Sequence, residues 1–219
     1  MTSIKQSTLG HVLLLELVET VSEDSRSFEG VQAELSGAWK QLDGSDDLRV
    51  AVLSGADGAF SLGSDHGQSA DGPSWDLDAL PLQTGKPVIA AVEGACYGLG
   101  FELALACDLR VAAEGSSFGF PDLGVSMPFR VASVLLPRIT FAGLSLELLL
   151  SGRTLDATQA FQGRLANRVV TKGEALRSAI DMAESLVDRF GNDGDFKKQR
   201  ILRMSGVPLV TAMNLAREP

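Results

Sequence analysis

The sequence predicts an α/β protein in two parts, a β/α core over residues 1–136 and a helical region over residues 137–219. Two observations support this prediction. In the first part, short apolar runs that are typical of buried strands alternate with segments of helical spacing, as in parallel strands joined by helices. In the second part, segments of helical spacing follow one another, and each ends at a glycine or a polar stop.

A strand, a helix and a second strand are expected near the N-terminus. Residues 11–18 (HVLLLELV) form an apolar run that predicts a strand. Apolar residues then recur at gaps of three and four from Phe28 to Leu42, which predicts a helix with one buried face. Residues 49–54 (RVAVLS) predict the second strand, and because a helix joins the two strands we expect them to be parallel.

The rest of the core is expected to repeat this alternation. Residues 66–81 have little pattern and predict a loop or a short helix. Residues 87–94 (PVIAAVEG) predict a strand, residues 99–106 a helix and residues 109–113 a further strand. The segment SSFGFPDLGV then predicts a short strand and a turn. In the helical region, Thr154-Leu-Asp156-Ala is expected to begin a helix that stops at Gly163.

The composition excludes several classes of protein. A formal net charge of −9 disfavours binding to nucleic acid and to anionic membranes. Cys96 and Cys107 lie in apolar runs, are too few for a disulfide framework and match no metal-binding spacing. With only His11 and His66, a histidine-rich metal site is excluded. The N-terminus lacks a signal-peptide core and no apolar run is long enough to span a membrane, so we expect a cytoplasmic enzyme or binding protein without a metal.

Two glycine-containing turns are candidates for binding an oxyanion. Residues 59–65 (AFSLGSD) follow a predicted strand, and a glycine at 63 allows a sharp turn that leaves the next N–H free. Residues 94–102 (GACYGLGFE) carry a strand into a helix N-terminus, where free amides and a partial positive charge suit an oxyanion. The alternatives are a turn capped by Ser64 or Asp65, and an incomplete dinucleotide-binding loop.

Two carboxylates follow these turns. Glu102 lies in the first turn of the second predicted helix, and Asp122 follows a proline at a strand end in FGFPD. Alone, Glu102 would only complement the helix dipole and Asp122 would cap a turn. Together, two amide donors and two acid/base groups are what enolate chemistry requires.

The chain resembles the crotonase superfamily, the enoyl-CoA hydratases and isomerases. AFSLGSD is similar to that family's AFxAGxD turn, and KPVIAAVEGACYGLGFELALACDLRVAA is similar to its most specific stretch. FGFPD resembles FxxPE, and SGRTLDATQAFQGRLANRVV resembles a later stretch of the family. The similarity extends from about residue 10 to residue 190.

The resemblance implies a spiral core of ββα units and a C-terminal helical oligomerisation region that forms a homotrimer or homohexamer. It implies that the N–H groups of Ser64 and Leu99 form an oxyanion hole and that Glu102 and Asp122 take the places of two catalytic glutamates. The substrate would be an acyl-CoA, with coenzyme A as part of the substrate and no separate cofactor. The residues implied to line the substrate are Ala59, Phe60, Leu62, Gly63, Asp65, Gly98 and Gly100.

The chain departs from the family pattern at several positions. Asp122 replaces a glutamate, which shortens its reach by one methylene, and Leu99 replaces a glycine but keeps its N–H. A glycine-rich segment after FGFPD and the usual turn after the first strand are absent. Because the chain ends at Pro219, earlier than the pattern, we expect part of the tail that covers the acyl pocket to be absent. These departures bear on which reaction the protein catalyses more than on which fold it adopts.

Three functions agree with these residues: reversible hydration of a 2-enoyl-CoA, isomerisation or decarboxylation on the same fold, and acyl-CoA binding without catalysis. A dehydrogenase fits poorly, because the dinucleotide motif is incomplete. A basic cluster at Lys197, Lys198, Arg200 and Arg203 is expected to attract the CoA phosphates, unless it is a solvated helix face. The apolar stripes expected to pack on neighbouring subunits are Leu144, Leu148, Leu149, Ala179, Met182, Ala183 and Leu186.

Overall fold

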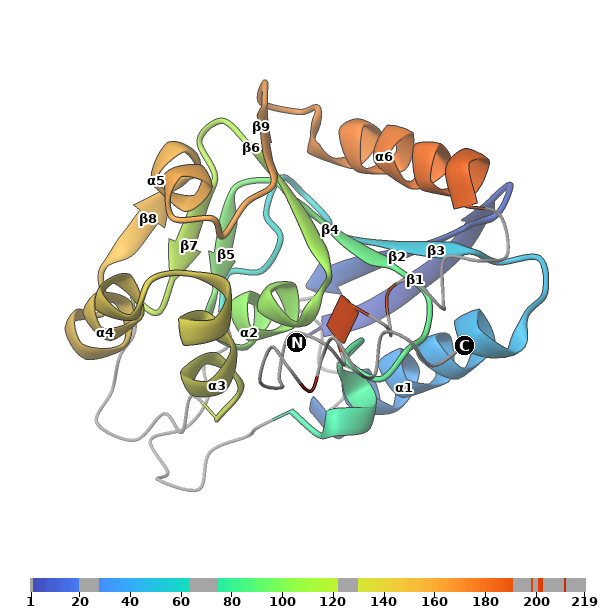
Figure 1. Ribbon diagram of the computed structural model, residues 1–219, viewed down its shortest axis with the longest axis horizontal. Coiled ribbons are helices and arrows are strands. Elements are labelled where there is room, and N and C mark those ends of the chain that lie inside the picture. The colour runs from blue at the N-terminus through green and yellow to red at the C-terminus, as the bar shows by residue number, and fades with distance from the viewer. Residues whose placement is uncertain are drawn as a thin grey trace.

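The computed structural model describes residues 2–19, 28–63, 75–121, 130–190, 198, 201–202 and 211. These residues form a six-stranded sheet in the order β1-β2-β3-β4-β6-β9 and a three-stranded sheet in the order β5-β7-β8 (Figure 1). The strands are β1 (Thr2–Leu9), β2 (Val12–Glu19), β3 (Val50–Gly55), β4 (Val88–Val92), β5 (Ala95–Tyr97), β6 (Leu109–Ala113), β7 (Ser117–Gly119), β8 (Thr154–Asp156) and β9 (Arg168–Val170). The helices are α1 (Phe28–Gly44), the 3-10 helix η1 (Leu77–Ala79), α2 (Gly98–Ala106), α3 (Arg130–Ile139), α4 (Ala142–Ser151), α5 (Ala157–Gln162) and α6 (Ala175–Phe190).

The central strands of the large sheet are buried on both faces, which confirms the predicted α/β fold. β2, β3, β4, β6 and β9 pair in parallel, and β1 adds an antiparallel edge. In Figure 1, α6 covers one face of this sheet and α1 lies on the other. Along β3, Val50 and Val52 belong to the apolar cluster under α6, while Ala51 and Leu53 belong to the cluster that includes α1. Burial on both faces explains why these strands are continuous apolar runs.

Helix α1 has the buried stripe that its spacing predicts, since Val31, Leu35, Trp39 and Leu42 are all buried. A buried cation binds one carbonyl at its C-terminal end and two in the segment that follows. Lys86 Nζ donates to the carbonyl oxygens of Leu42 at 2.8 Å, Ser45 at 2.6 Å and Leu48 at 2.7 Å. An ammonium group at a helix C-terminus is favoured by both the free carbonyls and the helix dipole.

Several short elements differ from the sequence prediction. The N-terminal strand β1 was not expected, and β5 lies inside a segment expected to be only a turn. The region after residue 137 is not uniformly helical, because β8 and β9 lie within it. β5, β8 and β9 have three residues each, so their hydrogen bonds to partner strands define them more than any sequence pattern does, whereas β1 has eight residues. The division of the chain at residue 136 stays a prediction.

The expected helix at residues 154–163 begins slightly later than predicted. Thr154 lies in β8, and Asp156 is the N-cap of α5. Asp156 Oδ1 accepts from the Gln159 N–H at 2.7 Å, and Gln159 Oε1 accepts from the Asp156 N–H at 3.1 Å, which forms a capping box. Gly163 is the C-cap, as predicted.

The apolar stripe of α6 packs on its own sheet rather than on a neighbouring subunit. Ala179, Met182 and Ala183 are buried against strands of the large sheet, and Leu186 packs against the same cluster. Leu148 of α4 is likewise buried within the chain. These side chains are thus covered within their own chain, and the predicted packing of the helical region on neighbouring subunits stays a prediction.

Replacing Lys86 with methionine should test how much the buried ammonium contributes to the fold. We expect the free energy of unfolding to fall by about 3 kcal/mol, since hydrogen bonds from a charged donor contribute about 1.5–3 kcal/mol each and do not add fully. Urea denaturation measures this loss. The control is Lys40→Met on the exposed face of α1, which should change stability by less than about 0.5 kcal/mol. Equal losses in the two variants would contradict the assignment.

Candidate active site

The turn after β3 is held alongside β5 by backbone hydrogen bonds. The N–H groups of Phe60 and Ser61 both donate to the carbonyl oxygen of Ala95 at 2.9 Å. The Tyr97 N–H donates to the carbonyl oxygen of Ser61 at 3.1 Å, and Ser61 forms a parallel bridge with Cys96. These contacts bring the first candidate turn to the N-terminus of α2, which begins directly after β5.

The two glycines that precede the proposed oxyanion donors lie close to each other. Gly63 and Gly98 have positive φ angles of 81° and 55°, conformations that favour glycine. A Cβ added to Gly98 would lie 3.7 Å from Gly63 Cα. A Cβ on Gly100 would lie 2.2 Å from the Cβ of Ser61, so only glycine permits this approach of helix and turn. The backbone thus brings together the residues immediately before Ser64 and Leu99.

Leu99 lies in the first turn of α2, where amides have no partner within the helix. Its side chain is only 5% exposed and belongs to the main apolar cluster. The leucine that stands in place of the family's glycine therefore has its side chain in the core. The backbone N–H remains the group that can serve a ligand.

Glu102 is buried between α2 and α3. Its Oε1 accepts from the backbone N–H groups of Ala132 at 2.8 Å and Val131 at 3.1 Å, in the first turn of α3. Burial raises the pKa of Glu102 above its ordinary value, and the hydrogen bonds from Ala132 and Val131 offset part of this rise. A carboxyl group with a raised pKa is more readily protonated near neutral pH, which suits a proton carrier.

The contact between Glu102 and α3 was not predicted from the sequence. Its donors lie 29 and 30 residues further along the chain, and no local pattern links them to a glutamate in α2. A carboxylate at a helix N-terminus is favoured by the free amides and by the helix dipole. Glu102 therefore has a structural contact in addition to its proposed catalytic role.

Three of the predicted site residues, Ser64, Asp65 and Asp122, lie outside the described residues. The described chain leads directly to each of them. Gly63, which precedes Ser64, is in place beside Gly98. Phe120, two residues before Asp122, packs on Phe101 of α2 with ring centroids 5.2 Å apart.

The other residues proposed to line the substrate differ in their exposure. The Phe60 side chain is 1% exposed and lies in the core, so it is the backbone at this position that belongs to the turn. Leu62 is 60% exposed, and Ala59 is half-buried. The turn therefore places one apolar side chain in the core and another toward the surface.

The sequence model of the enoyl-CoA hydratase/isomerase family matches residues 28–214 of this chain. The chain belongs to the enoyl-CoA hydratase/isomerase family. Carnitinyl-CoA dehydratase of Salmonella typhi is 37% identical over 154 residues, which cover 65% of this chain and 59% of that protein. The chain thus matches less than two thirds of the length of such curated relatives.

Solved structures of this family have the same fold. Enoyl-CoA hydratase of Mycobacterium tuberculosis H37Rv is similar with a TM-score of 0.82 and 29% identity, over 96% of this chain and 86% of that chain. Enoyl-CoA hydratase EchA1 of Mycobacterium marinum also has a TM-score of 0.82 and 29% identity, over 97% of this chain and 86% of that chain. The expected crotonase-like fold is confirmed.

Among the described residues there is no cluster of His, Cys, Asp and Glu that could hold a metal ion, and no helix long and apolar enough to cross a membrane. Cys96 and Cys107 are buried free thiols, as predicted. Burial raises the pKa of Cys107 to about 12 and raises that of Cys96 well above its ordinary value. Both cysteines are therefore protonated core residues in this family member.

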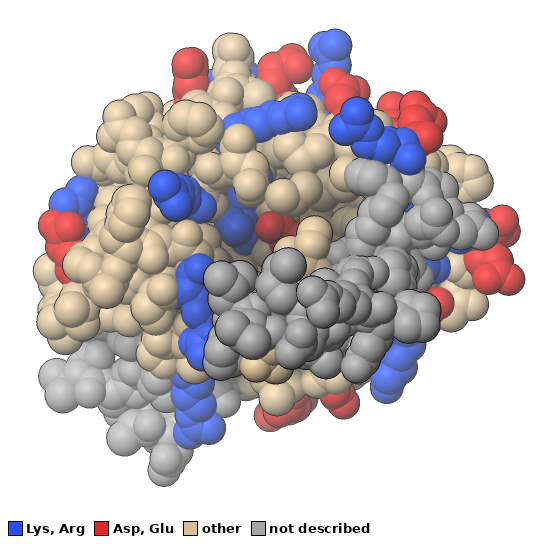
Figure 2. Space-filling model, viewed as in Figure 1, with Lys and Arg blue, Asp and Glu red and all other residues tan. Residues whose placement is uncertain are grey.

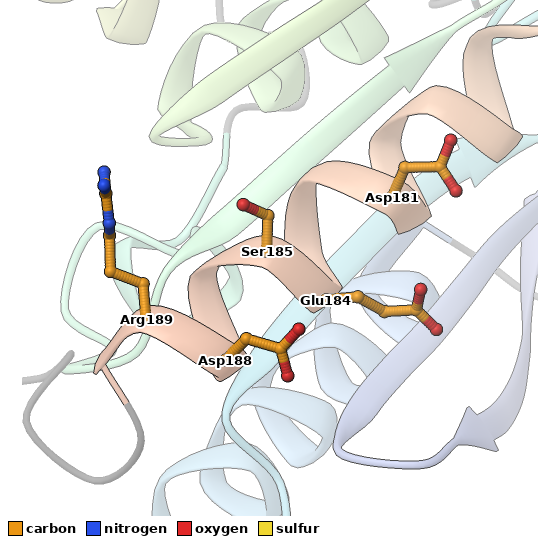
Figure 3. Close-up of a pocket in the computed structure, with 5 residues that line it drawn as sticks. All are labelled: Asp181, Glu184, Ser185, Asp188 and Arg189. Carbon is orange, nitrogen blue, oxygen red and sulfur yellow. The ribbon is translucent and has the colours of Figure 1, made fainter.

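A hollow of about 570 Å³ lies on α6, away from these residues. Its lining residues are Asp181, Glu184, Ser185, Asp188 and Arg189 (Figure 3). In Figure 3 the three carboxylates point away from Arg189, and all five side chains come from one helix. Because α6 lies on the opposite side of the large sheet from α2 in Figure 1, this hollow is separate from the candidate active site.

Lys198 does not lie on an open basic face, contrary to the prediction for the C-terminal cluster. Its Nζ is 2.8 Å from Asp108 Oδ2, its side chain is 8% exposed, and it donates to the carbonyl oxygen of Lys86 at 3.0 Å. Lys197, Arg200 and Arg203 lie outside the described residues. On the face shown in Figure 2, Lys and Arg are spread rather than gathered into one patch.

The variant Glu102→Gln should separate the charge of this residue from its contact with α3. The amide oxygen can accept the same two N–H groups, but the side chain cannot ionise. The pKa of Glu102 is raised in the folded protein. The contribution of this group to wild-type stability is therefore fully present below the ordinary pKa of 4.5 and is lost as pH rises through the raised pKa. We therefore expect the stability of Glu102→Gln relative to wild type to increase from about pH 4 to about pH 8, by about 1.4 kcal/mol per unit of pKa elevation.

Urea denaturation of both proteins at several pH values measures this difference. Glu184→Gln, at an exposed position on α6, is the matched control and should show a nearly flat profile. If the relative stability of Glu102→Gln falls as pH rises, the pKa of Glu102 is lowered rather than raised.

Proposed function

We propose that this protein is an acyl-CoA enzyme that stabilises a thioester enolate and catalyses the reversible hydration of a 2-enoyl-CoA. The observation that carries the proposal is the close approach of Gly63 to Gly98, which brings the amide-bearing turn after β3 to the first turn of α2. Glu102, buried in the same helix, supplies a carboxyl group close by in the sequence. Membership of the enoyl-CoA hydratase/isomerase family and similarity to a carnitinyl-CoA dehydratase and an enoyl-CoA hydratase support the choice of reaction.

The backbone amides of Ser64 and Leu99 would bind the thioester oxygen. As water adds to the β-carbon of the enoyl group, negative charge moves to this oxygen. Two N–H donors fixed in advance stabilise that charge more than they stabilise the neutral carbonyl, and removal of one such donor typically costs about 10²–10³-fold in rate. The expected residues Ala59, Leu62, Gly98 and Gly100 would shape the surrounding surface.

Glu102 and Asp122 would transfer the protons of the added water. One carboxylate takes a proton from the water as its oxygen bonds to the β-carbon, and one carboxylic acid gives a proton to the α-carbon as the enolate collapses. The β-carbon thereby gains the hydroxyl group of the water and the α-carbon gains a proton, with no change of overall oxidation state. The raised pKa of Glu102 supports its assignment as the group that holds a proton.

A double-bond isomerase of the same fold is the second candidate. It would need only one carboxyl group, which removes a proton from one carbon and returns it to another. The burial of Glu102 and its contact with α3 favour this alternative, because a single positioned proton carrier suffices for it. The same variants distinguish the two reactions.

Loss of either carboxyl group should reduce hydration if the two act together. We expect Glu102→Gln and Asp122→Asn each to lower kcat for a short 2-enoyl-CoA by about 10²–10⁴-fold, with thioester binding retained. Loss of absorbance of the conjugated enoyl thioester measures the rate. Asp122→Glu restores the missing methylene and should preserve or raise the rate.

Different outcomes identify the other functions. An isomerase would lose activity on a 3-enoyl-CoA with one substitution and be indifferent to the other. A protein that only binds acyl-CoA would show no turnover in any variant. Wild-type rates of hydration in both Glu102→Gln and Asp122→Asn would exclude the proposed mechanism.

The proposed assembly is a homotrimer or homohexamer, supported by exposed apolar side chains around α3, α4 and α5. They are Val134, Phe141, Leu146, Leu150 and Phe161, which are 48–79% exposed. A contiguous apolar patch formed by these side chains would suit a surface that a partner covers.

Light scattering should therefore give a mass of about three or six times that of the 23.1 kDa chain. We expect Leu150→Lys, at the most exposed of these positions, to shift the mass toward the monomer, whereas Lys40→Met on α1 should not. A monomeric wild-type protein at micromolar concentration would contradict the proposal.

A further inference from the structure

Trp75 follows the first candidate turn in the sequence and forms a hydrogen bond with the second candidate turn. Its indole Nε1–H donates to the carbonyl oxygen of Leu99 at 2.9 Å, and the ring is 8% exposed. Leu99 carries the amide proposed as an oxyanion donor. The chain that leaves the site at Gly63 thus contacts it again at Trp75, at the start of α2.

Trp75 is itself held by α1. The N–H of the next residue, Asp76, donates to Gln32 Oε1 at 2.5 Å. This bond, at the residue next to the ring, holds Trp75 against α1 while its indole reaches α2.

We propose that Trp75 is a positioning residue for the oxyanion hole, acting through the backbone of Leu99. The inference rests on the proposed role of the Leu99 amide in binding a thioester oxygen. The first turn of a helix lacks part of its hydrogen bonding and frays most easily. By holding the Leu99 carbonyl, the indole fixes the peptide unit that shares its Cα with the donating N–H.

The need for such a contact follows from how an oxyanion hole works. Its donors lower the barrier only if they are already directed at the position of the oxyanion, and a misplacement of about 1 Å can cost about 10²-fold. Gly98 and Gly100, on either side of Leu99, give this backbone more freedom than other residues would. A buried hydrogen bond from a ring anchored elsewhere restricts that freedom.

Trp39 provides a matched control. It is the other tryptophan of the chain, it is 4% exposed, and its indole also donates to a backbone carbonyl. The acceptor, however, is Ala79 of η1 rather than a residue of α2. Trp39→Phe and Trp75→Phe therefore remove the same kind of bond at two distances from the proposed site.

The test uses a CoA thioester of a 3-arylacrylic acid, whose absorbance maximum moves to longer wavelength when its carbonyl is hydrogen-bonded. We expect the wild-type protein to produce this red shift. Trp75→Phe should lose at least about half of it and about 10-fold in kcat, with less than about a threefold change in Kd, as expected for donors that are displaced rather than removed. Trp39→Phe should keep both the shift and kcat.

An isosteric replacement covers the case in which Trp75→Phe does not fold. In the Trp39→Phe background, Trp75 is the only tryptophan, so incorporation of 3-benzothienylalanine replaces it alone. Sulfur takes the place of the N–H while the shape of the ring is kept. The red shift should fall as in Trp75→Phe.

Each outcome bears on a different claim. A full red shift without the Trp75 N–H, or an equal loss in Trp39→Phe and Trp75→Phe, would overturn the positioning role. Binding of the thioester by the wild type with no red shift would overturn the oxyanion hole and this inference with it. A red shift that depends on Trp75 in a protein without hydratase activity would leave the positioning role intact and reject only the proposed reaction.

Discussion

The close approach of the turn after β3 to the start of α2 is the contact on which the candidate site depends. β3 and β4 are parallel neighbours, so their carboxyl ends lie at the same edge of the sheet. The bonds from Phe60 and Ser61 to Ala95 then carry the turn along β5, and Gly100 leaves room for Ser61 against the helix. A side chain at Gly100 would separate the two elements and with them the proposed amide donors.

Buried charges in this acidic chain follow the ends of its helices. Lys86 lies at the carbonyls that end α1, and Arg110 Nη1 donates to the carbonyl oxygens of Ala104 and Cys107 at the end of α2. Glu102 lies at the amides that begin α3. Helix dipoles favour each of these placements. The raised pKa of Glu102 lets this carboxyl group take up a proton, so a contact that stabilises the fold can also take part in chemistry.

The sequence predicts the long elements of this fold and only part of its site. Apolar residues at helical spacing identify α1, continuous apolar runs identify β3 and β4, and the glycine spacing indicates the turns around Gly63 and Gly98. β9 is only three residues long and is defined by its pairing with β6. The bonds from α3 to Glu102 and from Trp75 to Leu99 span 24 to 30 residues, and no local pattern encodes such a distance. Tertiary packing alone determines them.

Leu99 shows how a departure from the family pattern fits this arrangement. A glycine at this position would leave three consecutive glycines at the start of α2, which would destabilise a helix by about 1 kcal/mol for each glycine relative to alanine. The leucine side chain is buried in the core, and its carbonyl is held by the Trp75 indole. The buried side chain and the bonded carbonyl therefore both restrain the backbone of Leu99. Its N–H is left as the part of the residue that can face a ligand. The substitution thus agrees with a rigid oxyanion hole rather than with the loss of one.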